Sequence, residues 1–436
     1  MRYLPIDNKL FIENRKRFVE QLPEDSVAIF YSNDQQPRNG DQYFPYRQQS
    51  DFFYLTGIDQ EKSILIIAPD DKNKKLSEAL FLIKTNEQIA IWEGHKYSKE
   101  EAKKISGIDN IYWLDEFDIA IKEIMSTTNN IFLNRNEYAK FFPDVKERNH
   151  RLGEQLKTKF PLHNYHRSAP LLTQLRLIKS DEEIKLLHKA CDITNLAFKR
   201  VLSNIKPGSY EFEIQAEIEH EFTNNRANGH GYAPIIASGS NACVLHYIEN
   251  DKECIDGDLV LFDFGAEYAN YSADMSRTIP VNGKFTPRQK ECYNAVLNVF
   301  KQAKQMYVPG NTIHKINDEV NNMMETEMIK LGLFTEEDVQ KQDKDNPLFK
   351  KYFMHGTAHF LGLDVHDVGG KDEEFKAGMV LTCEPGIYIP EENIGIRIEN
   401  DVLITKDSPI DLMEDIPIEV EDIEKMMNVT FGEHNH

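Results

Sequence analysis

Short apolar runs alternate with polar, helix-favouring stretches over about the first 170 residues. The apolar runs are typical of buried strands, which we expect at Ser26–Tyr31, Ser63–Ile67, Leu80–Lys84, Ile111–Leu114 and Ile131–Leu133. The polar segments between them, such as Lys99–Ile105, favour helices. Because strands that alternate with helices are typical of layered α/β folds, this part of the chain is predicted to form an α/β domain.

A different pattern begins near Leu175, where a long amphipathic helix is predicted. Ser180-Asp181-Glu182-Glu183 has the form of a capping box, and apolar residues recur with helical spacing from there to Val201. Pro207-Gly208 then ends the segment. We therefore divide the chain into an N-terminal domain, residues 1–172, and a C-terminal domain, residues 173–436.

The C-terminal domain contains an internal repeat, in which a helix, a Pro-Gly break, a second helix and β-rich sequence occur twice. In the first copy the second helix is predicted at Tyr210–Asn225. In the second copy Thr286-Pro287 begins a helix, Pro309-Gly310 ends it, and β-rich sequence returns after about Tyr352. The segment 331–351 has no counterpart in the first copy and is predicted to be a surface excursion.

The strands of the two copies match more closely than the helices. Gly257–Asp263 aligns with Gly378–Glu384, and in both segments a glycine begins an apolar run that ends in a carboxylate six residues later. One such match would be ordinary, because glycine often precedes a strand. Together with the matching Pro-Gly breaks it indicates a duplication, whose two halves would place these carboxylates near a shared pseudo-two-fold axis.

Four acidic residues lie within apolar strand sequence, one pair in each copy. Asp263 and Asp274 are eleven residues apart and are predicted to meet in one hairpin, and Glu384 and Glu399, fifteen apart, in another. Each could be an ordinary edge-strand charge or salt-bridge partner. Four like charges in one buried site, however, need cations or protons to compensate them, and two divalent metal ions would do so. Such an oxygen-rich site favours Mn²⁺, while Co²⁺, Zn²⁺ and Fe²⁺ stay open.

Three histidines, His355, His359 and His366, lie within twelve residues. The first two have the spacing of the HExxH zinc motif, but Gly356 replaces its glutamate and the nearby glycines disfavour the helix that the motif needs. A zincin is therefore excluded. The spacing leaves open which histidine binds metal and which of them hydrogen-bond a substrate.

Two more residues are candidates for the same site. His246 lies in the first copy and is either a structural or a functional histidine. Arg397 is two residues before Glu399, so strand alternation places both side chains on one face. Arg397 is predicted to orient a ligand carboxylate through a bidentate contact.

Composition narrows the classes of partner. The 436-residue chain has 72 acidic and 51 basic residues and a formal net charge of −21, which repels nucleic acid and anionic membranes. No apolar run approaches the roughly 20 residues of a membrane span, and we expect no signal peptide. The five cysteines are widely spaced and form no CxxC pair, which indicates the reducing cytoplasm.

The chain resembles the Xaa-Pro aminopeptidases, a metallopeptidase family with the pita-bread fold. In the C-terminal domain the motifs LHYIENDKE, LVLFDFGAEYANYSADMSRTIPVNGKFT, FMHGTAHFLGLDVHDVGG, LTCEPGIYI and GIRIENDVLIT occur in family order. In the N-terminal domain FPYRQQSDF, YLTG and IWEG resemble the family's creatinase-like domain. The resemblance implies an α/β (α+β) protein in which a creatinase-like α/β domain precedes a pita-bread domain with a pseudo-two-fold repeat.

The resemblance also implies residue roles. The metal ligands would be Asp263, Asp274, His359, Glu384 and Glu399. The catalytic residues would be Glu384, which handles the proton of the nucleophile, together with His246, His355, His366 and Arg397. Tyr388 and Trp92 would bind the substrate, with Trp92 as a wall of the site that a neighbouring subunit contributes.

The implied reaction is hydrolysis of the bond between an N-terminal residue and a following proline by a hydroxide that bridges two metal ions. Substrates would be peptides with proline at the second position, and a homo-oligomer, a dimer or tetramer, is expected in the cytoplasm. The main rival is a prolidase, which cleaves only Xaa-Pro dipeptides and shares all five ligands. A catalytically inactive pita-bread binding module and a metal-free creatinase-type amidohydrolase are disfavoured because all five ligands are present.

Overall fold

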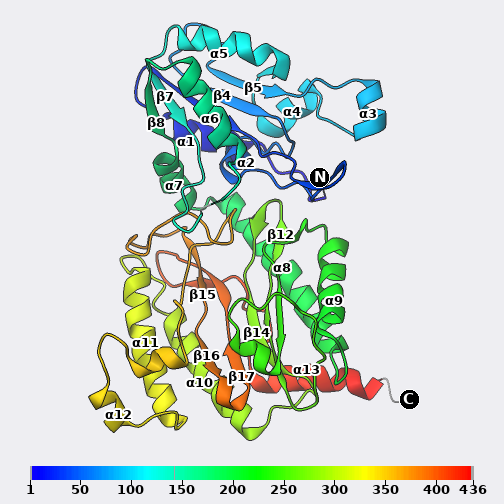
Figure 1. The fold of residues 1–436 in the computed structure, drawn as a ribbon, viewed down its shortest axis with the longest axis vertical. Helices are drawn as coiled ribbons and strands as arrows, with labels where there is room; N and C mark the ends of the chain where they lie inside the picture. Colours follow the sequence, from blue (N-terminus) through cyan, green and yellow to red (C-terminus); the bar gives the residue numbers. More distant parts are fainter. Residues whose placement is uncertain (1, 142, 434–436) are drawn as a thin grey trace. The chain divides into compact units, whose positions relative to one another are not determined.

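The computed structural model describes residues 2–141 and 143–433. The chain divides after Arg176 into two compact units, an N-terminal unit in blue to teal and a C-terminal unit in green to red (Figure 1). Within the described ranges, no helix has both the length and the apolar character that a membrane span requires.

The N-terminal unit is built around a six-stranded mixed sheet with the order β6-β5-β4-β1-β7-β8. Its strands are β1 (Ser26–Tyr31), β4 (Ile64–Ile67), β5 (Glu78–Leu82), β6 (Asn110–Trp113), β7 (Asn130–Leu133) and β8 (Asn164–Arg167). The five strands expected from the apolar runs are confirmed, with ends displaced by no more than two residues. Strand β8 was not predicted, because this edge strand has no buried residue and no apolar run.

Helices cover both faces of this sheet. Ile121 of α5 and Leu156 of α6 share a buried core with Ile29 of β1, while Phe18 of α1 packs edge-on against Phe30 on the opposite face. The helices are α1 (Lys9–Val19), α2 (Ser50–Thr56), α3 (Glu87–Glu93), α4 (Lys99–Ser106), α5 (Phe117–Met125), α6 (Arg148–Lys159) and α7 (Ala169–Leu177), and β2 (Pro37–Asn39) and β3 (Gln42–Tyr43) form an exposed hairpin. The predicted α/β layering is confirmed.

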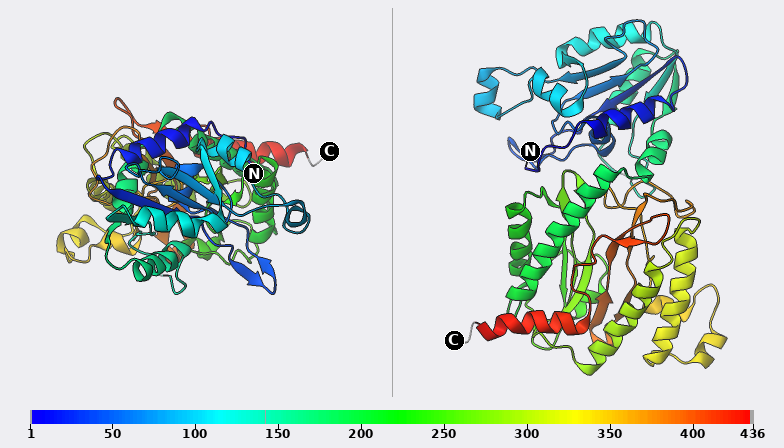
Figure 2. Two further views of the ribbon diagram at one scale, coloured as in Figure 1. Left: turned by 90° about the horizontal axis from the view of Figure 1, so that it is seen from above. Right: turned by 180° about the vertical axis from the view of Figure 1, so that it is seen from behind.

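The C-terminal unit has two pairs of helices on either side of a set of short strands (Figures 1 and 2). The helices are α8 (Asp181–Asn204), α9 (Glu211–Asn224), α10 (Pro287–Lys304), α11 (Ile313–Lys330), α12 (Glu336–Lys341) and α13 (Val420–Glu433). The first-half strands are β9 (Gly229–His230), β10 (Ile235–Ser238), β11 (Leu259–Asp263), β12 (Ala266–Tyr268), β13 (Tyr271–Ser272) and β14 (Ser276–Pro280). The second-half strands are β15 (Val380–Cys383), β16 (Gly386–Ile389), β17 (Ile394–Arg397), β18 (Asn400–Leu403) and β19 (Ile410–Asp411).

The helix starts predicted from the sequence are confirmed by their caps. The Ser180 side chain accepts a hydrogen bond from the Glu183 backbone, and the Glu183 side chain accepts one from the Ser180 backbone. Thr286 and Gln289 form the same reciprocal pair at α10, with Pro287 in the first turn. Each cap satisfies amide groups that the first turn leaves unpaired, which typically stabilises a helix by about 1 kcal/mol.

The backbone at the matched glycines supports the duplication. Gly208 and Gly310, in the two Pro-Gly breaks, have φ values of 89° and 86°. Gly257 and Gly378, at the two strand entries, have φ values of 90° and 94°. This left-handed conformation favours glycine, and its recurrence at both pairs of aligned positions shows that the two halves follow the same path there.

The two halves meet at a backbone bridge. In the first half β11 pairs antiparallel with β14, and in the second half β15 pairs antiparallel with β18. Ser276 of β14 pairs with Glu399, which directly precedes β18, and the Glu399 amide donates to the Ser276 carbonyl at 3.0 Å. The carboxylate-bearing ends of both hairpins therefore lie at this junction.

Two segments differ in character from the rest of the repeat. Residues 331–351 contain the short helix α12 and no buried residue, as expected of a surface excursion. The sequence after Tyr352, predicted to be β-rich, is irregular until β15 begins at Val380. Five glycines interrupt this stretch, and it pairs with β15 through a bridge between Phe360 and Leu381.

Candidate metal centre

A tight hairpin in the first half brings Asp263 and Asp274 together. The strands approach closely at Gly265, where a Cβ atom would lie 1.7 Å from the carbonyl oxygen of Ala273. The Tyr232 hydroxyl lies 2.7 Å from Oδ1 of Asp263 and 2.5 Å from Oδ1 of Asp274. The two carboxylates therefore face one common space, as the sequence predicts.

The second hairpin places Glu384 and Glu399 opposite each other. Glu384 directly follows β15 and Glu399 directly precedes β18, and the last residue of β15 pairs with the first residue of β18. The Ser276 hydroxyl, which belongs to the first half, donates a hydrogen bond of 2.7 Å to Oε2 of Glu399. This bond connects the carboxylates of the second half to those of the first.

His359 reaches the carboxylates because its backbone runs along β15. The amide of Thr382 donates to the His359 carbonyl at 2.9 Å, and the amide of Glu384 donates to the carbonyl of Thr357 at 2.8 Å. The Nε2 atom of His359 then lies 3.3 Å from Asp274 and 3.9 Å from Glu384. His359 thus joins the carboxylate cluster.

Arg397 supports the cluster in a way that differs from the prediction. Its Nη2 atom donates to Oδ2 of Asp263 at 2.6 Å, while Nε donates to the Ser276 hydroxyl at 2.7 Å and Nη1 donates to the Tyr388 hydroxyl at 2.9 Å. The guanidinium therefore contacts Asp263 through one nitrogen only, instead of making the expected bidentate contact. Its other two nitrogens donate to Ser276 and Tyr388. The strand geometry causes this, because β14 and β16 each present a hydroxyl to it.

His355 lies at the edge of the cluster and is held in one tautomer. Its Nδ1 atom is 2.7 Å from the Gly356 carbonyl and must donate to it, so Nε2 accepts from the Tyr388 hydroxyl at 2.8 Å. Burial and the charge of Arg397 lower the pKa of His355 to about 4, which keeps the ring neutral. Tyr388 itself is fully buried, so it lies behind His355.

The two remaining histidines are exposed. The ring of His366 packs perpendicular to that of His359, with ring centroids 4.5 Å apart. His246 is close enough to His355 for its charge to lower the pKa of that ring. The structure thus brings all the predicted histidines to the neighbourhood of the carboxylate cluster.

Crowded carboxylates dominate the electrostatics of the site. Burial raises the pKa of Glu384 to about 7 and that of Glu399 well above its usual value, and neighbouring carboxylates add to both shifts. Burial opposes the charged form of His359, but Asp274 and Glu384 outweigh it and raise the pKa of that ring to about 9. The cluster therefore repels its own negative charge and attracts cations.

Comparison with known proteins agrees with this chemistry. Residues 185–406 match the model of metallopeptidase family M24, and residues 11–132 match that of the aminopeptidase P N-terminal domain. A Haemophilus influenzae protein named Xaa-Pro aminopeptidase is 36% identical over 437 residues, which cover 96% of this chain and 97% of the relative. An Escherichia coli protein of the same name is also 36% identical, over 97% of this chain and 98% of its own.

The chain belongs to metallopeptidase family M24. Solved structures of similar proteins include E. coli aminopeptidase P with the inhibitor Pro-Leu, at 33% identity and a TM-score of 0.86, covering 98% of this chain and 100% of that one. The Yersinia pestis proline aminopeptidase P II has the same identity and TM-score over 97% of this chain and 100% of its own. The predicted resemblance, the fold class and the hydrolase class are thereby confirmed.

The residues present in this M24 peptidase fit divalent metal ions, as family membership implies. Asp274, His359 and Glu399 each offer a ligand atom, and these atoms lie within 4.8 Å of one another. Carboxylate oxygens with one imidazole form a donor set suited to divalent cations. Burial and then the neighbouring carboxylates raise the pKa of Glu384 and Glu399, and a cation would relieve the repulsion between these carboxylates.

Three polar residues that contact the acidic residues of the M24 site were not predicted from the sequence. These are Tyr232, which contacts Asp263 and Asp274, Ser276, which contacts Glu399, and Asp401, whose Oδ2 accepts from the Asp274 amide at 3.1 Å. No spacing could have identified Tyr232. For Ser276 the signal was its position two residues after Asp274, on the same strand face.

Trp92 belongs to the N-terminal unit and not to the unit that forms the metal centre. It is 82% exposed, and its helix α3 has no buried residue.

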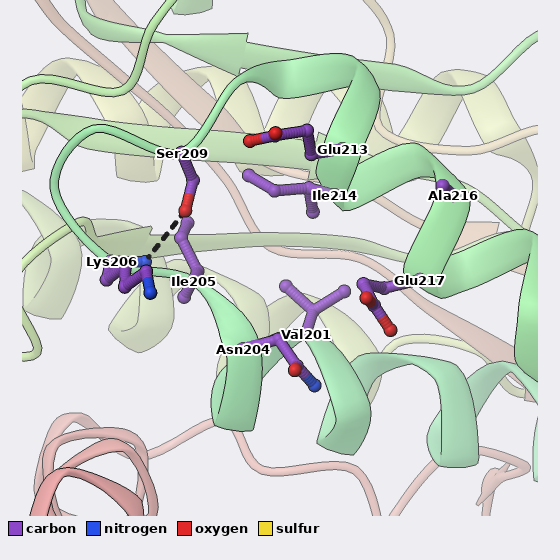
Figure 3. A pocket seen from close by; sticks show the side chains of 9 residues that line it. All are labelled: Val201, Asn204, Ile205, Lys206, Ser209, Glu213, Ile214, Ala216 and Glu217. Carbon is purple, nitrogen blue, oxygen red and sulfur yellow. Dashed lines mark hydrogen bonds between the residues drawn. The ribbon is translucent and has the colours of Figure 1, made fainter. Parts of the chain in front are cut away.

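A surface cavity of about 410 Å³ lies between the end of α8 and the start of α9, and Figure 3 shows Val201, Ile214 and Glu217 in its wall. None of the predicted site residues lines this cavity.

Proposed function

We propose that this M24 metallopeptidase removes the N-terminal residue from peptides whose second residue is proline. The observation that carries the proposal is the buried cluster of Asp274, His359 and Glu399 in a chain that matches proteins named Xaa-Pro aminopeptidase along almost its whole length. The aminopeptidase P N-terminal domain supports the same activity. We further propose that the chain has two functional domains, residues 1–172 and 173–436. Their boundary lies close to Arg176, after which the second compact unit begins.

In this proposal Asp263, Asp274, His359, Glu384 and Glu399 hold two divalent metal ions, with Mn²⁺ preferred for the oxygen-rich donor set. The ions would polarise the scissile carbonyl and lower the pKa of a bound water. Zinc can occupy a related site, because one solved E. coli aminopeptidase P is described as zinc-substituted. Mn²⁺ is therefore a proposal about preference and not about the only ion that fits.

The chain's own residues would orient the peptide and move the proton. Glu384 faces both His355, at 3.8 Å, and His359, at 3.9 Å, and is proposed to take the proton of the attacking water and pass it to the leaving amine. Arg397 fixes Asp263, and Tyr388 fixes His355. Both ring nitrogens of His355 are engaged, whereas His246 is exposed, so His246 is proposed to meet the peptide. His366 would steady His359 through their ring contact.

The free cysteines and the exposed tryptophan support two further proposals. All five cysteines are free, which suits a reducing cytoplasm. Trp92 and Ile91 are 82% and 79% exposed on α3, and large exposed apolar side chains are enriched at protein interfaces. We propose a homodimer or homotetramer in which Trp92 contacts a neighbouring subunit.

The activity is tested by comparing an Xaa-Pro-Xaa tripeptide with an Xaa-Pro dipeptide. The proposal expects release of the first residue from the tripeptide, with loss of several orders of magnitude in kcat/KM for Asp263→Asn and for Glu384→Gln. Asp256→Asn is a matched control, because Asp256 is exposed and accepts a hydrogen bond from the Asn282 side chain on the surface. Hydrolysis of the dipeptide alone would instead identify a prolidase, and near-normal turnover in the Asp263 or Glu384 variant would contradict the mechanism.

A further inference from the structure

A fully buried carboxylate outside the metal centre, that of Glu211, has no part in the proposed chemistry. Glu211 is the first residue of α9 and has no exposed surface. A buried charge is costly unless hydrogen bonds compensate it. The surroundings of Glu211 supply five donors, enough for all of the roughly four lone-pair sites of a carboxylate.

All five donors come from one stretch of chain, residues 238–252. Oε1 accepts from the Ser238 amide at 2.8 Å, from the Ser238 hydroxyl at 2.6 Å and from the Asn241 side chain at 3.4 Å. Oε2 accepts from the Tyr247 hydroxyl at 2.7 Å and from the Lys252 amide at 3.0 Å. One side chain thus ties together both ends and the middle of this stretch.

Residues 239–251, which we name the His246 loop, are therefore closed by Glu211. The backbone adds to the closure, because the Glu211 amide donates to the Lys252 carbonyl at 2.9 Å. Tyr247 is buried and points to Glu211, while Val244, His246 and Ile248 are exposed. The anchored tyrosine decides which side chains of the loop face solvent.

His246 depends on its backbone for its position more than His355 and His359 do. Within the described part of the chain its imidazole makes no hydrogen bond, whereas His355 and His359 each bond to a neighbouring carbonyl. With no hydrogen bond of its own among the described residues, the ring of His246 depends on the backbone of its loop for its position. A shift of about 1 Å in a group that contacts substrate can cost about 100-fold in rate.

We propose that Glu211 is a positioning residue that sets His246 for contact with the peptide, by fixing the His246 loop. The inference rests on the proposed function, because it assigns Glu211 a role in that reaction through His246. It predicts that Glu211 matters for kcat/KM but not for metal affinity, since its hydrogen bonds go to none of the five proposed ligands.

The test compares Glu211→Gln with Glu213→Gln, a matched change on the same helix. In Glu211→Gln, an NH₂ group replaces one of the two acceptor oxygens. This group faces donors and cannot accept from them, so the backbone amide of Ser238 or of Lys252 loses its hydrogen-bond acceptor. Glu213 lies on the exposed side of α9, beside the cavity in Figure 3, and glutamine can keep its bond to the Tyr210 amide. We expect kcat/KM for an Xaa-Pro-Xaa tripeptide to fall about 10- to 100-fold in Glu211→Gln and to stay unchanged in Glu213→Gln, with the Mn²⁺ dissociation constant unchanged in both.

A double-mutant cycle separates positioning from a general structural effect. If Glu211 acts through His246, adding Glu211→Gln to His246→Ala lowers kcat/KM no further than His246→Ala alone. The inference would be overturned if the two substitutions lowered kcat/KM by factors that multiply in the double variant. It would also be overturned if a folded Glu211→Gln kept wild-type kcat/KM. If Glu211→Gln does not fold, Tyr247→Phe replaces it in the same cycle, because it removes one of the five bonds and keeps the ring.

The same cycle keeps the inference distinct from the proposed function. Wild-type activity in His246→Ala would contradict the proposed role of His246 itself and the inference with it. Loss of activity in His246→Ala, combined with wild-type activity in Glu211→Gln, would contradict the inference alone.

Discussion

At the scale of single residues, the site depends on polar side chains that hold the carboxylates from behind. Ser276 is the clearest case, because its hydroxyl donates to Glu399 and accepts from Arg397, both at 2.7 Å. It thereby connects a residue at the junction of the two halves with the guanidinium that binds Asp263. Groups that orient metal ligands typically contribute 10- to 100-fold to metal affinity or activity.

Removal of this hydroxyl by Ser276→Ala is expected to weaken Mn²⁺ binding about 10-fold or more while the protein remains folded. Titration calorimetry of the metal-free protein measures this directly. Ser203→Ala serves as the control, since Ser203 is exposed on α8 and donates to a carbonyl of its own helix. An unchanged dissociation constant in Ser276→Ala would show that Ser276 does not orient the ligands.

His230 predicts an acid-sensitive contribution to stability. Neither ring nitrogen has a hydrogen-bond partner among the described residues, and burial lowers the pKa to about 4 although Glu219 lies 3.9 Å away. The unfolded chain, with a histidine pKa near 6.5, binds the proton more readily, so stability is lost as the pH falls from about 7 towards 4. Between about pH 7.5 and 5 this group alone lowers the free energy of unfolding by about 2 kcal/mol.

The variant His230→Gln should therefore lose less stability than the wild type over the same pH interval. Urea unfolding at both ends of that interval gives both free energies. Parallel losses in the two proteins would mean that His230 is protonated as easily in the folded as in the unfolded state.

Which residues could be predicted follows from where their signals lie. The four carboxylates could be predicted because each lies in apolar strand sequence, where burial of an acidic side chain is unfavourable unless it is paired or binds a cation. Tyr232 and Glu211 did not, because their partners are distant in sequence and belong to no motif. The contact of Arg397 with a ligand carboxylate was expected. Its hydrogen bonds to two further partners depend on the neighbouring strands, which no local sequence pattern indicates.

At the scale of elements, the hairpin of the first half depends on a close approach at Gly265. A Cβ atom there would lie 1.7 Å from the Ala273 carbonyl, which belongs to the backbone and moves only with the strand.

The repeat and the capped helix starts were predictable because their signals are local. The irregular stretch after Tyr352 was not, since its path is set by contacts with β15.

Gly265→Ala is expected to separate Asp263 from Asp274 and to abolish tight metal binding. The control is Gly370→Ala, where a Cβ atom meets nothing within 4 Å and φ lies outside the left-handed region. Metal content after dialysis against Mn²⁺, with the urea midpoint of both variants, measures the effect. Full metal content in a folded Gly265→Ala would show that the hairpin tolerates a wider spacing.

At the scale of the whole molecule, the metal centre belongs to the duplication. Asp263 and Asp274 come from the first half and Glu384 and Glu399 from the second, and Ser276 and Glu399 join the halves. Neither half alone holds all four carboxylates. The net charge of −21 has a different origin, since only four of the 72 acidic residues belong to the centre, and a net charge of this size favours solubility.

Cleavage before proline is proposed to require two divalent ions in this cluster. The most direct test follows hydrolysis of an Xaa-Pro-Xaa tripeptide by chelator-treated protein as Mn²⁺ is added back. We expect no turnover without metal, and activity that rises to a plateau at two equivalents per chain. Full activity in protein shown to be metal-free would contradict it.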